Sequence, residues 1–535
     1  NASIERKGSR AARRGAGVTS RGAGARSTLA LFTAERRRRQ RWRSVYVIYF
    51  TMFQMSLGFS IVLTGVWPYI DQLEPGSKKE ILGVAVGANP LGQLLFSPLL
   101  GWWADRRRGA RLPLLLALAL FVLASLLYSH LHLTRPYAKY WMIFARFLVG
   151  VSSANIAVAR SYLSSATLVS ERTKAVAGVS LAQVLGFVVG PALQAAAAPL
   201  GPGADYPPLD RMLRLDMYTA PGWFNALLGV VNFALFLPCC FTERKIALQE
   251  AMLAQGKETE QEALQALKPD PVSSWTLVGA FFVLVFNFVL LETLATSLTM
   301  DQFAWTKQEY MGALMCAGAL VACVTFALIG PLTKIFEERS LLLWGGFLLT
   351  GLASVLCIPW GSSAPAPAAE DGAPGAGAGC PVRAQPWCAT TAALTLPQFL
   401  MGYACVSVGY PLGVTLIQTI FSKVLGPRPQ GVWQGVLTGA GCVSRALGPV
   451  FVAGVYARRG PAATFATTAA ITFLTLFGLR LVYNRLRPLS PDPAPPGREL
   501  TPLSADKRDV TDDPEAPAHQ QLIVRIPLRD ERDNT

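Results

Sequence analysis

Residues 186–191 read Gly-Phe-Val-Val-Gly-Pro and close an apolar stretch that follows a short polar turn. A second version of this arrangement lies in the other half of the chain. There a polar turn at residues 422–430 precedes an apolar stretch that contains Gly435 and then Gly-Pro at 448–449. Two copies of one signature among long apolar stretches are typical of membrane proteins built from repeated bundles of helices. The sequence therefore predicts two related halves.

Twelve apolar stretches are long enough to be membrane spans. A helix of about 20 apolar residues crosses a hydrocarbon layer of roughly 30 Å, and short polar turns between the stretches favour packed helices over a barrel. The predicted fold is an all-α polytopic membrane protein with twelve transmembrane helices in two six-helix halves. The approximate bounds of the spans are 44–70, 80–103, 112–132, 140–163, 175–198, 221–241, 275–298, 310–332, 340–358, 389–421, 431–456 and 462–483.

The overall composition is that of a membrane protein rather than a soluble enzyme. Of the 535 residues, 52% are apolar and 15% are charged, whereas soluble proteins carry about 25% charged residues. Three histidines leave no catalytic triad to propose, and no Cys or His spacing fits a zinc or iron–sulfur site. We expect no enzymatic activity, no cofactor and no metal.

The basic residues indicate which side of the membrane each loop faces. Residues 1–43 contain thirteen Lys or Arg and two Glu, and four arginines lie between the second and third spans at 106–111. Loops rich in Lys and Arg stay in the cytosol, which explains this charge better than nucleic-acid binding does. With an even number of spans, both termini are expected in the cytosol.

Changes in composition divide the chain into five parts. We expect a basic disordered cytosolic tail, a six-helix bundle, a cytosolic linker with a helix at the membrane surface, a second six-helix bundle and a disordered cytosolic tail. A Pro-, Gly- and Ala-rich loop at 359–379 is expected within the second bundle. The five parts are residues 1–43, 44–242, 243–273, 274–486 and 487–535.

Two cysteines differ from the others because they lie in a predicted non-cytosolic loop. Cys380 and Cys388 follow the ninth span, and the compartment on that side of the membrane permits oxidation. The sequence allows either a disulfide between them or two free thiols.

Four ionisable residues lie within predicted spans, where an unpaired charge costs several kcal/mol. They are expected to face the bundle interior or water, and they are the candidates for transport or gating. Arg146 and Glu292 lie at similar depths and can therefore form a pair, in which case the carboxylate of Glu292 stays charged. If Glu292 is unpaired, it is a candidate proton carrier. The residues are Arg146, Arg160, Glu292 and Arg445.

The turn after the second span resembles a signature of the major facilitator superfamily. It contains Gly101, Asp105 and Arg106, and Gly109 comes one residue later than in that signature. A glycine allows close helix packing, and an Asp can cap a neighbouring helix. The alternative is a set of arginines that only determine topology.

The fifth span carries Gly186, Gly190 and Pro191, which resemble a motif of the drug:proton antiporter branch of that superfamily. Gly448 and Pro449 are the counterparts in the eleventh span. Small residues let helices touch, and a proline inside a helix produces a kink. The sequence allows two roles for these motifs: a hinge within the helix, or tight packing between helices without any hinge.

Further strings resemble the family of the lysosomal major facilitator superfamily domain-containing protein 8. The resemblance extends over about residues 41–485 and implies an endolysosomal membrane protein associated with chloride movement. The chain has no Asn-x-Ser/Thr sequon in a predicted luminal loop, so a divergent paralogue is the alternative. Matching strings occur at 67–69 (WPY), 155–162 (NIAVARSY), 298–306 (LTMDQFAWT), 385–388 (QPWC) and 423–431 (KVLGPRPQG).

Three functions follow from these features. The leading hypothesis is a transporter or channel for a small anion, with chloride as the preferred solute, in the lysosomal or late endosomal membrane. The second is a proton-coupled exchanger of organic solutes. The third is a membrane scaffold that transports nothing. The expected partners are membrane lipid, the small anion or organic solute and protons, with no nucleic acid.

Overall fold

The computed structural model of the chain describes residue 36 and residues 38–489, apart from short internal gaps. The predicted tails and much of the predicted loop at 359–379 lie outside the described residues. The gaps are 64, 76–79, 135–136, 202–214, 239, 256–258, 266, 305–307, 362–364, 368–378 and 383–384.

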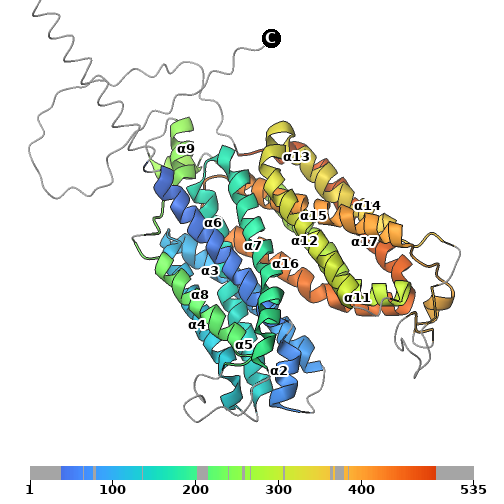
Figure 1. The fold of residues 1–535 in the computed structure, drawn as a ribbon. Coiled ribbons are helices and arrows are strands. Elements are labelled where there is room, and N and C mark those ends of the chain that lie inside the picture. Colours follow the sequence, from blue (N-terminus) through green and yellow to red (C-terminus); the bar gives the residue numbers. More distant parts are fainter. Residues whose placement is uncertain are drawn as a thin grey trace, which may run out of the picture. The chain divides into compact units, whose positions relative to one another are not determined.

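The first half of the chain forms helices that run back and forth beside one another (Figure 1). The fourth predicted span is broken at Ala154 into α5 and α6. The elements are a first helix Arg38–Leu63, α2 Val66–Leu73, α3 Glu80–Arg107, α4 Arg111–Ser129, α5 Ala138–Ser153, α6 Asn155–Ala166, α7 Val169–Ala197 and α8 Ala220–Leu235.

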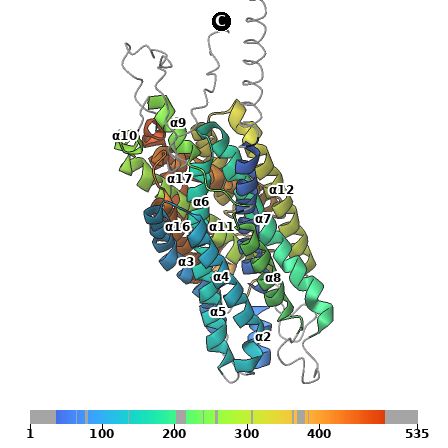
Figure 2. The same ribbon diagram turned by 90° about the vertical axis from the view of Figure 1, so that its left-hand side faces the viewer.

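Two short helices, α9 and α10, follow the first half and lie at one end of the bundle (Figure 2). The second half is again a series of long helices. Two π-helical stretches, Leu342–Leu348 and Val452–Tyr456, interrupt its spans. The elements are α9 Ile246–Gln255 and α10 Glu260–Gln265 in the linker, then α11 Pro271–Phe303, α12 Gln308–Ile335, α13 Glu338–Leu341, α14 Leu349–Leu356, α15 Leu396–Leu425, α16 Gly431–Phe451 and α17 Ala457–Leu481.

The described helices account for all twelve predicted spans. Ten are long and apolar enough to cross a membrane by length and composition, and Ala220–Leu235 is a shorter apolar helix at the sixth predicted span. One of the ten, Gly431–Leu481, bends at Gly460, where φ is 74°, and therefore supplies two spans. The fold is the predicted all-α polytopic one.

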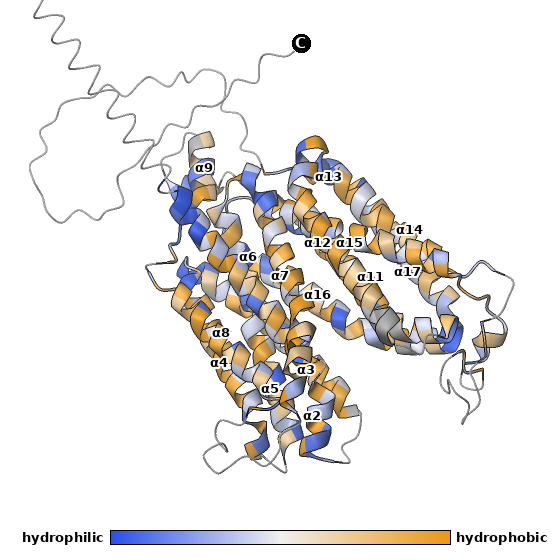
Figure 3. Ribbon diagram, in the orientation of Figure 1, coloured by the Kyte–Doolittle hydropathy of each residue, from blue (hydrophilic) through white to orange (hydrophobic). Residues whose placement is uncertain are grey.

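Hydropathy explains why these helices form a membrane bundle. Apolar residues dominate the long helices, and hydrophilic residues gather near α9 and beside α13 (Figure 3). Large apolar side chains remain exposed on the described surface: Leu320 is 67% exposed, and Leu474 is 71% exposed. Such extensive apolar exposure requires a lipid environment.

The halves meet at several helix pairs, of which α3 with α16 and α7 with α12 are the most extensive. The first pair packs backbone to backbone, because a Cβ at Gly101 would lie 2.1 Å from the carbonyl oxygen of Gly431. Gly101 thus provides the close helix packing that its position in the turn after the second span predicted.

The two span boundaries that differ most from the prediction are the end of the first span and the start of the tenth. The first span ends at Leu63, and a turn at Gly65 separates it from α2. The tenth begins at Leu396 rather than near residue 389, because Thr395 and Gln398 form a capping box that starts the helix there. Apolar composition alone does not reveal such caps.

Candidate transport site

Three of the four ionisable residues predicted within spans come together where the halves meet. Arg445 of α16 interacts electrostatically with Arg160 of α6 and with Glu292 of α11. The phenol of Tyr410, on α15, is within electrostatic range of all three. These four residues are the central site, and they come from both halves.

Arg160 connects the halves through neutral partners. Its Nη1 donates to Oγ1 of Thr438 on α16 at 3.5 Å, and its Nη2 donates to Oε1 of Gln183 on α7 at 3.4 Å. Its Nε has no hydrogen-bond partner in the described part of the chain. Long bonds to uncharged groups leave the positive charge of Arg160 uncompensated.

Glu292 and Arg445 have exposed side-chain surface although they lie deep within spans. Protein nonetheless surrounds Glu292 on most sides. The two charged groups form no ion pair within 4.0 Å. With two guanidinium groups and one carboxylate, the central site carries a net positive charge.

Several residues of this region were not identified from the sequence. The thiol of Cys442 donates to Oε1 of Gln93 across the halves at 3.2 Å, and Tyr410 stacks on Phe288 with ring centres 4.2 Å apart. Gln93 and Gln183 are polar side chains inside apolar spans, which is a signal that could have found them.

Arg146 is not part of the central site. It lies on α5 within the first half, 1% exposed, with its guanidinium 5.2 Å from the ring centre of Phe59. The pairing of Arg146 with Glu292 that the sequence left open does not form, because the charged group near Glu292 is Arg445. Similar depth in the membrane did not imply that the two side chains face each other.

The end of the bundle that carries α9 and α10 is called the linker end, and the opposite end, which carries Cys380 and Cys388, the disulfide end. At the linker end Asp105 accepts hydrogen bonds from the backbone N–H groups of Gly431 at 2.8 Å and Val432 at 3.0 Å. A carboxylate at a helix N-terminus is favourable, so Asp105 ties α3 to α16.

Arg106 does not join this contact. Its guanidinium lies 5.4 Å from the ring centre of Trp102, and both side chains are exposed. An arginine beside an exposed tryptophan fits an anchor at the membrane surface.

A second contact at the linker end was not predicted. The Nζ of Lys423 donates to Oε1 of Glu338 at 2.7 Å and to Oγ1 of Thr173 at 3.2 Å, and Thr173 also donates to Glu338. The buried Arg172 donates to the backbone oxygen of Ser422 at 3.2 Å. In the described residues, the hydrogen bonds that join the halves lie near mid-depth or toward the linker end. The linker end is therefore closed.

Comparison with known proteins identifies this architecture. The sequence model of the Major Facilitator Superfamily matches residues 45–369. Major facilitator superfamily domain-containing protein 8 of Xenopus laevis is 36% identical over 487 residues, which cover 86% of this chain and 94% of the relative. The chain belongs to the major facilitator superfamily. Within it, the chain is a member of the domain-containing protein 8 family, as its sequence strings predicted.

More distant similarities agree with this assignment. The class D tetracycline resistance protein of Salmonella ordonez is 27% identical over 51% of this chain and 62% of its own length. The solved structure of the human organic anion transporter MFSD10 has a TM-score of 0.56 at 18% identity, covering 82% of this chain and 99% of that one. The proton:xylose symporter XylE has a TM-score of 0.59 at 11% identity, covering 84% and 98%. The similarities to these two solved structures concern the fold alone. The family assignment makes the protein a membrane transporter of the major facilitator type.

The Gly-Pro motif of α7 packs this superfamily member's fifth span against its first. A Cβ at Gly186 would lie 2.2 Å from the carbonyl oxygen of Phe53, and one at Gly190 would lie 2.0 Å from Oγ of Ser60. Pro191 follows inside the helix. No other residue fits at these two glycines without moving the helices apart.

The second half repeats the arrangement with its own eleventh and seventh spans. A Cβ at Gly448 would lie 2.8 Å from Cγ1 of Val289 on α11, and Pro449 lies inside α16. Because α11 is the seventh span and therefore the counterpart of the first, the two halves share a packing mode as well as a sequence signature.

A disulfide joins Cys380 and Cys388. Between them Trp387 packs on the bend at Gly460, where a Cβ would lie 2.7 Å from the indole, and on Tyr456 with ring centres 5.3 Å apart. The loop after α14 thereby covers the corner between α16 and α17.

A carboxyl group lies beneath this loop, beyond the apolar part of α11 that ends at Ala295. Asp301 accepts a hydrogen bond from Oη of Tyr456 at 2.9 Å. Burial raises the pKa of Asp301, and hydrogen bonds from Tyr456 and Gln385 oppose this shift. The described residues contain no group of three or more His, Cys, Asp or Glu side chains that could hold a metal ion.

Proposed function

We propose that the protein moves a small anion, chloride in the first instance, through the central site. The observation that carries this proposal is the convergence of Arg160 and Arg445 from opposite halves, with the carboxylate of Glu292 beside Arg445. A site with net positive charge deep within the spans attracts anions and repels cations.

The charges also suggest how an anion drives the transport cycle. Arg160 belongs to the first half and Arg445 to the second, and like charges repel more strongly in a medium of low dielectric constant. An anion between them replaces this repulsion with attraction to both halves. An anion in the central site therefore favours closure of the two halves around it. The linker end then opens when the contacts of Asp105 with Gly431 and of Lys423 with Glu338 break.

Proton-coupled exchange of organic solutes is the second candidate. Glu292 is the observation that favours it, because a carboxylate in the central site can release its proton when a solute binds and take up a proton when the solute leaves. The structural neighbour MFSD10 is described as an organic anion transporter. A proton carrier at Glu292 predicts flux that responds to a pH gradient.

The proposed location is the lysosomal or late endosomal membrane, with the linker end and both termini in the cytosol. The resemblance to a lysosomal family supports the compartment. The arginines at the linker end and a disulfide at the opposite end support the orientation, since cytosolic loops are basic and cytosolic thiols stay reduced. Co-localisation of a tagged chain with lysosomal markers, and protease access to the tag in intact organelles, test both statements.

Flux in proteoliposomes tests the proposed activity. We expect the purified protein to carry chloride, and Arg445→Gln to lower the flux at least about tenfold, because it removes charge-assisted contacts worth about 1.5–3 kcal/mol. Arg458→Gln is the matched control, because Arg458 is exposed at the disulfide end. An Arg445→Gln flux equal to that of wild type contradicts the proposal.

The same vesicles distinguish the two candidate functions. Chloride flux that ignores a pH gradient and survives Glu292→Gln favours simple anion movement. Flux of a carboxylate or phosphate ester that needs the gradient, and loses this dependence in Glu292→Gln, favours exchange. If no anion tested shows flux, the remaining hypothesis is a membrane scaffold that transports nothing.

A further inference from the structure

Arg146 is buried within the first half, and two of its three guanidinium nitrogens lack a hydrogen-bond acceptor among the described residues. It is 1% exposed, and neither Nε nor Nη2 has a hydrogen-bond partner among the described residues. The ring of Phe59 covers one face of the guanidinium at 5.2 Å. A buried donor without an acceptor costs about 1–3 kcal/mol, and more when it is charged.

The positive charge of Arg146 also lacks a counter-charge. No ion pair in the described part of the chain includes it, and the ionisable group that affects it electrostatically is the phenol of Tyr128, which is neutral at physiological pH. A cation with only an aromatic face beside it remains strongly destabilised in a medium of low dielectric constant. The site is therefore incomplete in electrostatic terms.

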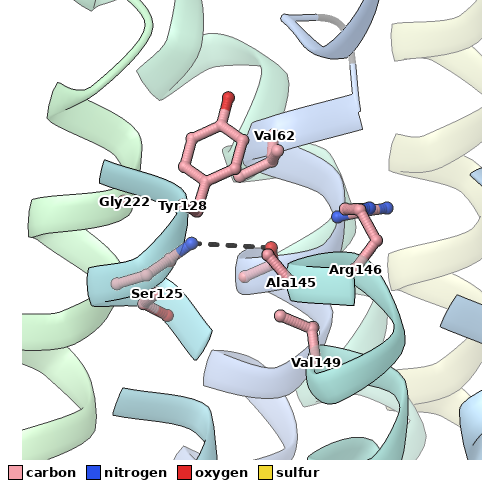
Figure 4. Close-up of a pocket in the computed structure, with 9 residues that line it drawn as sticks. Val62, Ser125, Tyr128, Ala145, Arg146, Val149 and Gly222 are labelled. Atoms are coloured by element: carbon pink, nitrogen blue, oxygen red, sulfur yellow. Dashed lines mark hydrogen bonds between the residues drawn. The ribbon is translucent and has the colours of Figure 1, made fainter. Parts of the chain in front are cut away.

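A small cavity adjoins Arg146 (Figure 4). It has room for roughly one water molecule. The hydroxyl of Ser125 donates to the backbone of Phe121 at 2.8 Å, and the amide of Asn225 donates to the Gly58 oxygen at 3.5 Å while its Oδ1 has no partner. The residues that line the cavity are Gly58, Val62, Ser125, Tyr128, Ala145, Arg146, Val149, Gly222 and Asn225.

We propose that this cavity holds a compact inorganic anion of halide size against Arg146. Water could satisfy the free N–H groups and the free Oδ1 of Asn225, but it would leave the charge of Arg146 uncompensated. A halide accepts from N–H groups and supplies the missing negative charge. The size of the cavity excludes organic carboxylates and phosphate esters.

This anion is a structural component of the first half rather than the transported solute. The electrostatic interactions of Arg160, Glu292 and Tyr410 include Arg445 but not Arg146. The cavity is lined entirely by residues of the first half. The inference is therefore independent of the proposed function, and the bound anion stabilises the bundle whether or not transport occurs.

Thermal unfolding of the purified full chain tests this site. We expect the unfolding temperature to rise by several degrees, with saturation, as chloride or bromide replaces gluconate at constant ionic strength. Arg146→Gln should abolish the rise, whereas Arg445→Gln and Arg160→Gln should retain it. A rise that persists in Arg146→Gln, or that disappears in Arg445→Gln, overturns the inference; the latter result would still support an anion at the central site.

Crystals of the wild-type protein grown in bromide provide a test that does not depend on a variant folding. We expect an anomalous scattering peak within hydrogen-bond distance of Nε or Nη2 of Arg146. A peak at Arg445 alone, or none in the first half, overturns the inference. Loss of flux in proteoliposomes with the peak still present would refute the proposed function and leave this site intact.

Discussion

Arg146 and Arg160 lie about four helical turns apart on one span, yet the structure places them in different surroundings. Arg160, on α6, contacts Gln183 of its own half and Thr438 of the other half. Arg146, on α5, lies against Phe59 and a cavity of the first half alone. A straight helix would turn both side chains to a similar direction, but the helix is broken at Ala154.

The difference shows that a charge within a span does not by itself mark the path of a solute. Both arginines incur a desolvation penalty within the membrane, and their partners distinguish them. Partners from both halves change when the halves move, whereas partners from one half stay fixed. Arg160 is therefore suited to transport, and Arg146 to holding the first half together.

Exchange of each arginine for methionine is expected to give the largest contrast. Arg160→Met should lower anion flux by about 10- to 100-fold, because contacts of a charged group contribute about 1.5–3 kcal/mol. Arg146→Met should keep flux within about twofold per folded molecule, since its contacts do not cross between the halves. Radiolabelled anion uptake, normalised to monodisperse protein, measures both. Equal losses in the two variants would remove the distinction.

The rigidity of α5 can be tested at its crossing with α3. A Cβ at Gly150 would lie 2.1 Å from the backbone oxygen of Asn89, so Gly150→Ala should destabilise the protein by about 1–3 kcal/mol through overpacking. Gly87→Ala on α3 is the matched control, because nothing lies within 4 Å of its Cβ position, and helix propensity predicts a gain of about 1 kcal/mol. Apparent unfolding temperatures should move in opposite directions. If both variants shift alike, α5 is not held by this crossing.

Asn155 follows the break between the two arginines and gives the smallest expected effect. It is fully buried, and neither Nδ2 nor Oδ1 has a hydrogen-bond partner in the described residues. Asn155→Ala should change stability by less than about 1 kcal/mol, because it removes no hydrogen bond within the protein. A larger loss in apparent unfolding temperature, with Asn155→Ser as the polar control, would reveal that the amide holds an ordered water or ion.

The spans were predictable because length and apolar composition decide them. The start of α15 at Leu396 was not, since it depends on the capping box formed by Thr395 and Gln398. Glycines of the repeated motif were identified from the sequence, but their contact partners on the first and seventh spans emerge only from the packed bundle.

The candidate site was predictable in its residue types and not in its arrangement. Arg160, Glu292 and Arg445 stood out as charges in apolar stretches, whereas Lys423 and Glu338 did not, because charges at span ends are common. Depth along a span follows from residue number, but rotation about the helix axis depends on how the helices pack. For that reason the sequence left open a pairing of Arg146 with Glu292 that does not form.

The Cys380–Cys388 disulfide has a practical consequence for producing this protein. Trp387 between the two cysteines fills the space beside Gly460, so the loop contributes to the corner at which the chain turns into its last span. A host cell that leaves this loop in a reducing environment would deliver chains in which the loop that packs on this corner lacks its covalent cross-link. Expression systems with an oxidising secretory route are therefore the appropriate source of material for crystals and vesicles.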